Sequence, residues 1–322
     1  MHRTAAALAA LALALASAIA AAQDFPTRPV RMLIPYTPGG PTDFVGRALA
    51  QRLHKPLGQQ VVVDNRPGGG GVIATEIVAR ANPDGHTILF ATPGQLITLP
   101  LLVPRLPYEP LTDFMPLTKL VDTPQVLIAN ARLPVANVAE LIAYARQRPG
   151  QLNYASVQTG GTGHLGMELL KQSAGIDMLH VPYKGTAPAM ASMISGETTM
   201  TITGMVALGP HVKSKRLKLL GVATMKRLAI APEVPTLHES GASGYDANQW
   251  YGVLTQAAVP RDIVAKLHTD TVKVMARPDV RERLAADGAE PVANTPEQFA
   301  AHIKSEIARW APVVKASGAK PD

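Results

Sequence analysis

Apolar residues along this chain follow two alternating patterns, short continuous runs and repeats at helical spacing. The first run, Val30–Ile34, is followed by Pro38-Gly39-Gly40-Pro41, which neither a helix nor a strand interior accepts. Beyond it, apolar residues recur at helical spacing up to Leu53. This pattern predicts a buried strand, a glycine turn and a helix, with Thr42 or Asp43 as the helix cap.

The same alternation continues to about residue 92. Runs at 60–64 and 86–91 predict a second and a third buried strand, and 72–81 predicts the helix between them. Strands that alternate with helices indicate a parallel sheet in an α/β domain. Thr92 and Gln95 would then lie at the sheet edge that carries the first glycine turn, where such sheets bind ligands.

A second unit of the same kind lies further along the chain. There, 152–156 predicts a strand, 157–161 a polar glycine turn and 164–174 a helix capped by Thr162. The proline-rich segment 100–125 between the two units is interpreted as irregular surface. The other elements expected around the second unit are strands at 125–129, 178–181, 199–203 and 217–223, and helices at 138–146 and 187–194.

Past residue 223 the pattern changes to one strand, at 249–255, and three helices, at 261–276, 278–287 and 296–316. A tail with so little sheet of its own is expected to pack on the first αβ set, which makes that domain discontinuous. The prediction is therefore two lobes, one of residues 23–122 and 226–322 and the other of residues 123–225. Two crossings, near 120 and 225, would let the lobes close on a ligand by hinge motion.

The N-terminal residues 1–22 have the composition of a cleaved secretory signal peptide. Arg3 is followed by an Ala/Leu run and then by small residues up to Ala22. The apolar run is shorter than the ~20 residues that cross a bilayer, and a retained anchor is the alternative. We therefore expect export to the periplasm and a mature chain that starts near Gln23.

The balance of charges points to small anions as partners. The chain carries 31 Lys and Arg against 24 Asp and Glu, a formal charge of +7, and it contains no Cys. Export and the lack of a dense Lys/Arg run argue against nucleic acid, so attraction of small anions is the simpler interpretation. Without Cys there is no disulfide framework and no lipidation site near the cleavage point.

Three other kinds of chemistry have weaker signals. Gly69-x-Gly71-x-x-Ala74 matches a dinucleotide fingerprint, but the next strand ends without the acid that holds the ribose. His164 and Glu168 could share a helix face as metal ligands, but no third ligand is identifiable. Ser156 and His164 could serve a secreted hydrolase, which remains the alternative function although no G-x-S-x-G motif is present. No metal and no cofactor are expected.

The two glycine turns are the strongest candidates for a site. Each follows a strand and opens a helix, which points free backbone N–H groups and the positive end of a helix dipole at one spot. Such a spot suits an anion. Both turns are rich in Gly, Thr and Ser and lack bulky side chains, which favours close approach of the backbone to a carboxylate.

Five stretches, taken together, resemble the Bug family, the extracytoplasmic solute receptors of tripartite tricarboxylate transporters. They are 26–50, 61–92, 152–170 with LNYASVQTGGTGHLGMELL, 180–190 with HVPYKGTAPAM, and 231–260. With the helical tail, the resemblance covers essentially all of the mature chain, in order.

The resemblance implies an α/β fold of the two-lobed periplasmic binding protein kind (type II-like). Each lobe would be a sheet flanked by helices, and two hinge crossings would join them. It implies a non-catalytic receptor that captures a small organic carboxylate and delivers it to a two-subunit membrane permease, as a monomer. A ligand sensor that acts on a signalling partner is a further alternative.

The resemblance also implies ligand contacts, made largely through backbone groups and bridging waters. The first loop would contribute Tyr36, Pro38, Gly39, Gly40, Thr42 and Asp43, with Thr92 and Gln95 beside it. The second loop would contribute Ser156, Thr159, Gly160, Gly161, Thr162 and His164. The second lobe would also border the cleft with Lys184, Gly185 and Thr203.

The sequence departs from the family pattern at two places. Val157-Gln158 stands where members usually carry a serine–glycine pair, and Thr203 stands where they usually have Asp. An acid at this second position would suit a ligand amine. Its loss therefore favours a plain carboxylate over an amino acid as the ligand.

Overall fold

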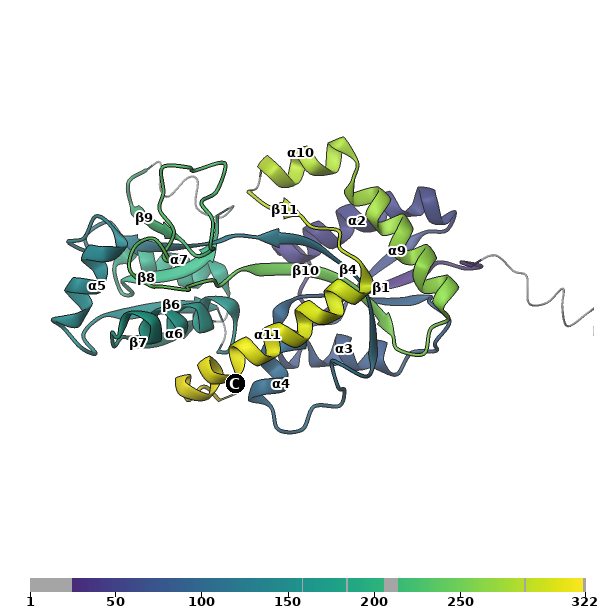
Figure 1. The fold of residues 1–322 in the computed structure, drawn as a ribbon, viewed down its shortest axis with the longest axis horizontal. Coiled ribbons are helices and arrows are strands. Elements are labelled where there is room, and N and C mark those ends of the chain that lie inside the picture. The colour runs from purple at the N-terminus through teal and green to yellow at the C-terminus, as the bar shows by residue number, and fades with distance from the viewer. Residues whose placement is uncertain (1–24, 158, 184, 206–213, 287, 321–322) are drawn as a thin grey trace, which may run out of the picture.

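The computed structural model describes residues 25–157, 159–183, 185–205, 214–286 and 288–320. They form two α/β lobes that lie side by side, each built on its own sheet (Figure 1). The predicted signal peptide and the residues Gln158 and Lys184 lie outside the described residues. Within the described ranges, no helix has both the length and the apolar composition that a membrane span requires.

The first sheet has six strands in the order β11-β4-β10-β3-β1-β2. Strand β1 is parallel to β2 and β3, whereas β10 is antiparallel to β3 and β4. The elements of this lobe are β1 Val30–Ile34, α2 Pro41–Leu57, β2 Val61–Asn65, η1 Gly69–Gly71, α3 Val72–Ala79, β3 Thr87–Ala91, η2 Gly94–Thr98, α4 Leu99–Leu102, β4 Phe114–Thr123, β10 Gln249–Gln256, α9 Arg261–Met275, α10 Pro278–Ala286, β11 Glu290–Pro291 and α11 Pro296–Ser317.

The second sheet has five strands in the order β7-β6-β8-β5-β9. Strand β6 is parallel to β7 and β8, and β5 is antiparallel to β8 and β9. The elements of this lobe are β5 Gln125–Asn130, α5 Val138–Arg146, β6 Asn153–Val157, α6 Thr162–Ala174, β7 Leu179–Tyr183, α7 Thr186–Ser195, β8 Met200–Gly204 and β9 Leu217–Val222.

Both sheets are mixed, not purely parallel as the strand–helix alternation predicted. In the first sheet, the chain returns from the second lobe as β10, which lies between β3 and β4 and runs against both. In the second sheet, β5 runs against β8 and β9. Repeated βα units by themselves would give only parallel neighbours. The late tail therefore completes the first sheet from its middle.

The prediction of an irregular surface segment at 100–125 is wrong for its second half. Residues Phe114–Thr123 form β4, which pairs with β10 on one side and β11 on the other. Pro116 is tolerated inside this strand because the register with β10 shifts between Val253 and Leu254, directly opposite it. A bulge is one of the few sheet positions that does not need the N–H that proline lacks.

Three smaller expectations also need correction. Strand β2 is an edge strand with half-exposed side chains, not a buried one, since it pairs only with β1 among the described strands. The N-caps of α2 and α6 are Gly40 and Gly161, and neither cap makes a side-chain hydrogen bond. Helix α2 begins one residue before Thr42, and α6 begins at Thr162 itself. Thr42 and Thr162 are thereby placed within the first helical turn.

The last helix, α11, packs on both lobes. Near its start, Phe299 meets Trp250 of β10 edge to face, with 5.3 Å between ring centroids. Near its end, the Val313 carbonyl accepts a hydrogen bond of 3.4 Å from Gln172 of α6. In Figure 1 this helix, in yellow, starts beside the strands of the first lobe and runs toward the second lobe.

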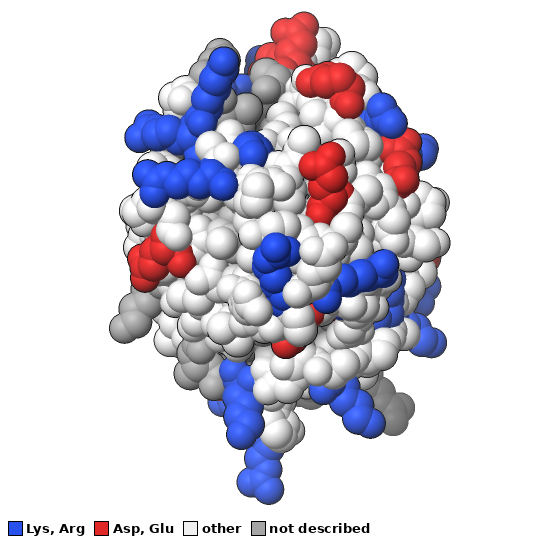
Figure 2. Space-filling view, turned by 90° about the vertical axis from the view of Figure 1, so that its left-hand side faces the viewer, with Lys and Arg blue, Asp and Glu red and all other residues white. Residues whose placement is uncertain are grey.

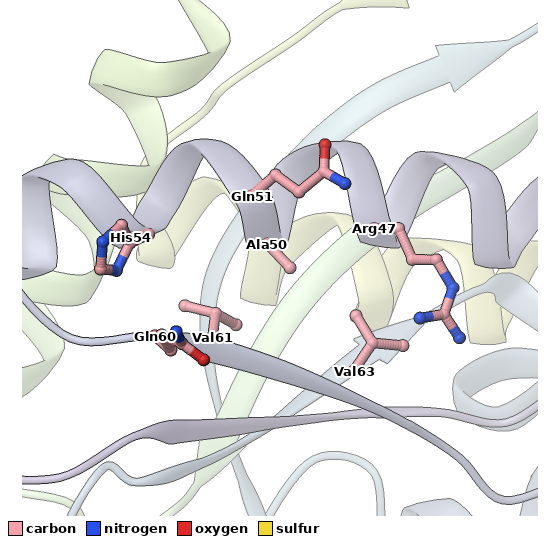
Figure 3. Close-up of a pocket in the computed structure, with 7 residues that line it drawn as sticks. All are labelled: Arg47, Ala50, Gln51, His54, Gln60, Val61 and Val63. Atoms are coloured by element: carbon pink, nitrogen blue, oxygen red, sulfur yellow. The ribbon is translucent and has the colours of Figure 1, made fainter.

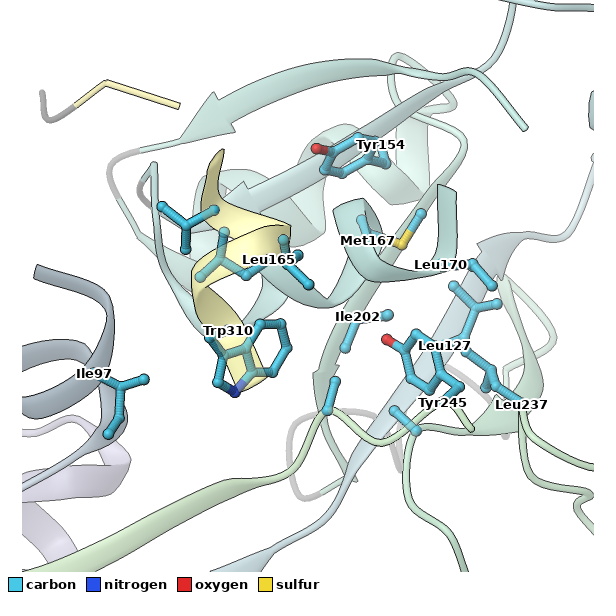
Figure 4. Packing of buried hydrophobic residues seen from close by; sticks show 14 of the residues in the cluster. Ile97, Leu127, Tyr154, Leu165, Met167, Leu170, Ile202, Leu237, Tyr245 and Trp310 are labelled. Carbon is cyan, nitrogen blue, oxygen red and sulfur yellow. The ribbon is translucent and has the colours of Figure 1, made fainter. Parts of the chain in front are cut away.

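One cluster of buried side chains extends through both lobes along this helix. Figure 4 shows Trp310 of α11 between Ile97 of the first lobe and Leu165 of α6. Burial of an aromatic side chain of this kind contributes about 1.5–3 kcal/mol. The tail therefore links the lobes by packing, in addition to the two passages of the main chain.

Candidate functional site

The first glycine turn lies between β1 and α2 and is held by a side chain from the helix that it opens. Gly39 has φ 87°, a left-handed conformation that favours glycine. Its N–H donates a hydrogen bond of 2.9 Å to Oδ2 of Asp43, in the first turn of α2. The turn is thus locked to the helix, and its remaining polar groups keep one orientation.

Asp43 is the buried centre of a half-exposed network behind this loop. Its carboxylate also accepts hydrogen bonds from Arg47, at 3.0 Å, and from Asn65 Nδ2, at 2.9 Å. Asn65 in turn donates to the Tyr36 carbonyl at 3.0 Å. Burial by itself opposes ionisation of Asp43, but the hydrogen bonds from Arg47, Gly39 and Asn65 outweigh it and hold the pKa of this carboxyl below its usual range.

Three predicted side chains of the first lobe meet in a second network. Tyr36 Oη lies 3.1 Å from Thr92 Oγ1 and accepts a hydrogen bond of 2.9 Å from Gln95 Nε2. Gln95 Oε1 accepts from the Thr92 N–H and hydroxyl, at 3.0 and 2.9 Å. The prediction that Thr92 and Gln95 share an edge with the first loop is confirmed, because β1 and β3 are parallel neighbours.

The floor beneath the first loop comes from β10. The hydroxyls of Thr42 and Tyr251 form a hydrogen bond, and burial raises the pKa of Tyr251 to about 12. Trp250 and Tyr251 of β10 are both buried in the core.

The second glycine turn, between β6 and α6, repeats the arrangement of the first. The N–H of Gly160 donates a hydrogen bond of 2.9 Å to Nδ1 of His164, four residues later in α6. Gly160 also has a positive φ, 76°. In both lobes, therefore, the glycine N–H is held by the side chain at position i+4, an aspartate in one lobe and a histidine in the other.

Two stacked imidazoles support this second turn. The rings of His164 and His180 lie 3.9 Å apart between centroids, almost parallel. His180 Nε2 lies 2.6 Å from Ser156 Oγ, the last buried residue of β6. Ser156 and His164, the pair suggested for a hydrolase, thus serve different partners, since His164 Nδ1 is used by Gly160.

The remaining predicted residues of the second lobe lie at the same sheet edge. Strands β6, β7 and β8 are parallel, so Thr159, Gly185 and Thr203 all follow or end strands on one side of the sheet. Gly185 is the residue before α7. The Thr162 hydroxyl donates to Gln249 Oε1, which ties the start of α6 to the first residue of β10, where the chain re-enters the first lobe.

The two lobes approach each other beside the second turn. A Cβ added to Gly160 would clash with Leu102 Cδ1, at the end of α4 in the first lobe. At the start of α6, a Cβ on Gly163 would lie 2.7 Å from the Ile202 carbonyl oxygen. The side chain of Leu102 therefore lies against the bare backbone of the second turn, and the start of α6 packs closely on β8 within its own lobe.

Sequence reasoning missed Asn65 and His180 as supports of the two loops. Asn65 ends a strand parallel to β1, so its position at that edge was a usable signal. For His180, the contact with Ser156 depends on the register of β6 and β7, which no local pattern reveals. Among the described residues, no group of three or more His, Asp and Glu side chains is arranged to hold a metal ion.

The charge of the chain is spread over the surface that can be seen. Figure 2 shows the end of the molecule formed by the second lobe, where Lys and Arg side chains are interspersed with Asp and Glu. Such a mixed face does not have the single-sign field typical of nucleic-acid binding.

The stability of the folded protein is expected to fall when Asp43 becomes protonated. Because the folded pKa of Asp43 lies below its usual value, this stabilisation is complete above about pH 4 and is lost as the pH falls through the folded pKa. Urea unfolding at about pH 6 and about pH 3 measures the loss. Asp43→Asn should lose less stability between these two values, and an equal loss would contradict the assignment.

Comparison with known proteins gives the chain a family. Residues 45–319 match the model of the tripartite tricarboxylate transporter family receptor. Protein BugT of Bordetella pertussis is 36% identical over 300 residues, which cover 93% of this chain and 92% of BugT.

Solved structures agree with this match. The R. palustris protein Rpa4515 with adipate has 38% identity and a TM-score of 0.83, over 93% of this chain and 100% of that one. The periplasmic binding protein BugD has 35% identity and a TM-score of 0.80, over 92% and 100%. MatC from Rhodopseudomonas palustris with bound malate has 32% identity and a TM-score of 0.78, over 90% and 100%.

The structural matches cover more than nine tenths of this chain, and they confirm the two-lobed periplasmic binding protein fold. The chain therefore belongs to the tripartite tricarboxylate transporter receptor family, with the Bug proteins, and is a solute-binding receptor, not an enzyme.

Proposed function

We propose that this protein is a periplasmic receptor that closes on one small organic carboxylate and delivers it to a tripartite tricarboxylate transporter. The observation that carries the proposal is the repeated loop. In each lobe a glycine turn opens a long helix, and a side chain four residues later holds the turn by its N–H.

The first turns of α2 and α6 supply the donors for the carboxylate. The first backbone hydrogen bonds of these helices are donated by the N–H groups of Phe44 and Leu165, so the N–H groups before them face out of the helix. The helix dipoles add favourable potential at the same points. Four charge-assisted hydrogen bonds would contribute ~6–12 kcal/mol before ordering costs, in the range of the ~8 kcal/mol of micromolar binding.

The ligand contacts that we propose fall into two groups by role. Tyr36, Thr42 and the backbone of the two turns would contact the acid directly. Asp43 and His164 would act mainly by holding the turns, since their polar atoms are already used by Gly39 and Gly160. The full set proposed for the cleft is Tyr36, Pro38, Gly39, Gly40, Thr42, Asp43, Thr92, Gln95, Ser156, Thr159, Gly160, Gly161, Thr162, His164, Lys184, Gly185 and Thr203.

The class of acid that we propose is a plain dicarboxylate. Adipate and malate, the ligands of two related structures, both belong to this class. A ligand amine would need an acceptor from the second lobe, and at the end of β8 this chain has Thr203, a neutral side chain. An amino acid is therefore expected to bind more weakly than its deaminated analogue.

Closure would take place between residues 23–122 with 226–322 and residues 123–225. The supporting observations are the passage from β4 to β5 and the return into β10, the two places where the main chain crosses between the lobes. Hinge closure of two lobes is a common way to enclose a ligand. Residues 1–22 would direct export as a cleaved signal peptide, and the mature chain would act as a monomer on a two-subunit permease.

The test is a thermal-shift screen of the mature protein with mono-, di- and tricarboxylates, followed by calorimetry. A ligand that binds only the folded state raises the melting temperature by mass action. We expect a dicarboxylate to give the largest shift, and succinate and glutarate to bind more tightly than aspartate and glutamate. No shift with any acid would refute the carboxylate receptor, and tighter binding of the amino acids would refute the ligand class.

A further inference from the structure

The sheet edges of this molecule are protected to different degrees. In the part of the chain that the structure describes, β7 carries Pro182, and β11 has only two residues. The end of β9 is covered, because Val222 exchanges hydrogen bonds with Pro235 and Leu237, at 2.9 and 2.8 Å. Strand β2, with the sequence VVVDN, has none of these devices. Proteins usually protect their edge strands, so an unprotected, valine-rich edge indicates a docking site.

The main chain of β2 has free positions along its outer side. Gln60 accepts from the Val30 N–H, and Arg66 donates to the Ile34 carbonyl, both at 2.9 Å. In a parallel pair, every second residue of a strand directs its N–H and C=O groups to the neighbouring strand, and the residues between direct theirs to the opposite side. The N–H and C=O groups of Val61 and Val63 therefore point away from β1, to the side where a further strand would lie.

A groove runs along this edge, between β2 and the outer face of α2. It has a volume of about 330 Å³ and a valine floor, and Figure 3 shows Arg47 and His54 on the helix above the strand. The lining residues are Arg47, Ala50, Gln51, His54, Gln60, Val61 and Val63. The site thus combines free main-chain groups, an apolar floor and basic side chains.

We propose that the β2 edge binds an extended acidic segment of the transporter's membrane permease, which adds to the sheet as a further strand. This inference rests on the proposed function, because delivery requires contact with a permease. Strand addition draws affinity from main-chain hydrogen bonds and specificity from side-chain pockets. A second copy of this chain fits less well, since Arg47 and His54 would face basic side chains of the same kind.

Docking at this edge would also reach the ligand loop. Arg47 lines the groove and at the same time holds Asp43, at 3.0 Å, and Asn65, at 2.7 Å. An acidic side chain in the groove would compete with these two residues for the guanidinium. A partner bound in the groove would therefore weaken the network of Arg47, Asp43 and Asn65 that holds the Gly39 turn.

The experiment measures uptake of a labelled dicarboxylate, one that the receptor binds in the screen above, by proteoliposomes containing the permease subunits. Val63→Pro removes one outward N–H and keeps the bonds to β1. It should raise the receptor concentration for half-maximal uptake about tenfold, with unchanged ligand affinity. Gln51→Glu adds a negative charge to the groove and should raise the receptor concentration for half-maximal uptake about threefold. The matched Gln51→Lys adds a positive charge and should not raise it.

The outcomes separate this inference from the proposed function. A wild-type protein that binds no carboxylate refutes the proposed function itself. Normal ligand binding with wild-type uptake in Val63→Pro and in both Gln51 variants overturns the docking site. If Val63→Pro does not fold, the Gln51 pair decides, because Gln51 is exposed and the two variants give this position opposite charges.

Discussion

Replacing Asp43 by alanine is expected to lower carboxylate affinity by about one to two orders of magnitude, the equivalent of one charge-assisted hydrogen bond. The carboxylate of Asp43 holds the Gly39 N–H, Asn65 and Arg47 at once. Without it, the first turn loses the fixed orientation that lets its remaining donors meet an acid. Stability should fall as well, by about 1–3 kcal/mol, because a buried network loses its acceptor.

Two further variants separate the role of this network from a general loss of stability. Asp43→Asn keeps the shape and one acceptor oxygen, so its affinity should lie between those of wild type and Asp43→Ala. Asp64→Ala removes an acid of β2 that is held by Arg31 at 2.7 Å and by Arg66 at 2.9 Å, away from the turn. It should cost stability but leave the calorimetric affinity unchanged. Wild-type affinity of Asp43→Ala would refute the role of Asp43 in holding the first turn for ligand binding.

The second large effect is expected from Gly160→Ala, which should weaken ligand binding by at least about tenfold. Two causes add together. Alanine at φ 76° is strained, by about 1–2 kcal/mol, and its Cβ would meet Leu102 of the opposite lobe. The added methyl group would therefore act as a wedge where the lobes approach each other.

A matched control is available in Gly175, which ends α6 with φ 60° and has no atom within 4 Å of an added Cβ. Gly175→Ala should cause similar strain and leave binding intact. The double variant Gly160→Ala/Leu102→Ala should recover part of the affinity, because the clash is removed and the strain is not. Calorimetry measures the affinities, and small-angle scattering with and without a bound dicarboxylate measures closure. If the double variant bound the ligand as weakly as the single one, a steric clash with Leu102 would not be the cause of the weaker binding.

Most individual elements of this fold could be predicted from the sequence, because burial imposes a period of 2 or 3.6 on each of them. The prediction failed at β4, where proline content argued against a strand. Pro116 is accepted there only because a register shift with β10 lies opposite it, and β10 comes from a part of the chain more than a hundred residues away. A local pattern contains no information about such a partner.

The candidate site likewise has parts that could be predicted from the sequence and parts that could not. Both glycine turns, Tyr36 and the pair Thr92 and Gln95 could be expected at one edge, since parallel strands bring their carboxyl ends together. The residues that support the turns could not be predicted from the sequence. Asn65, His180 and Leu102 reach them only through the order and register of the sheets and the approach of the lobes.

The local units of this protein follow from its amino-acid sequence alone, namely two strand–glycine-turn–helix loops, the tail helices and the resemblance to a receptor family. These follow from neighbouring residues, whose spacing and conformational limits act over one or two turns of chain. Only the tertiary packing places Asn65 and His180 against the two turns and leaves β2 as an open edge. Those features depend on which distant segments pack together, and that choice is made by the burial of the whole chain.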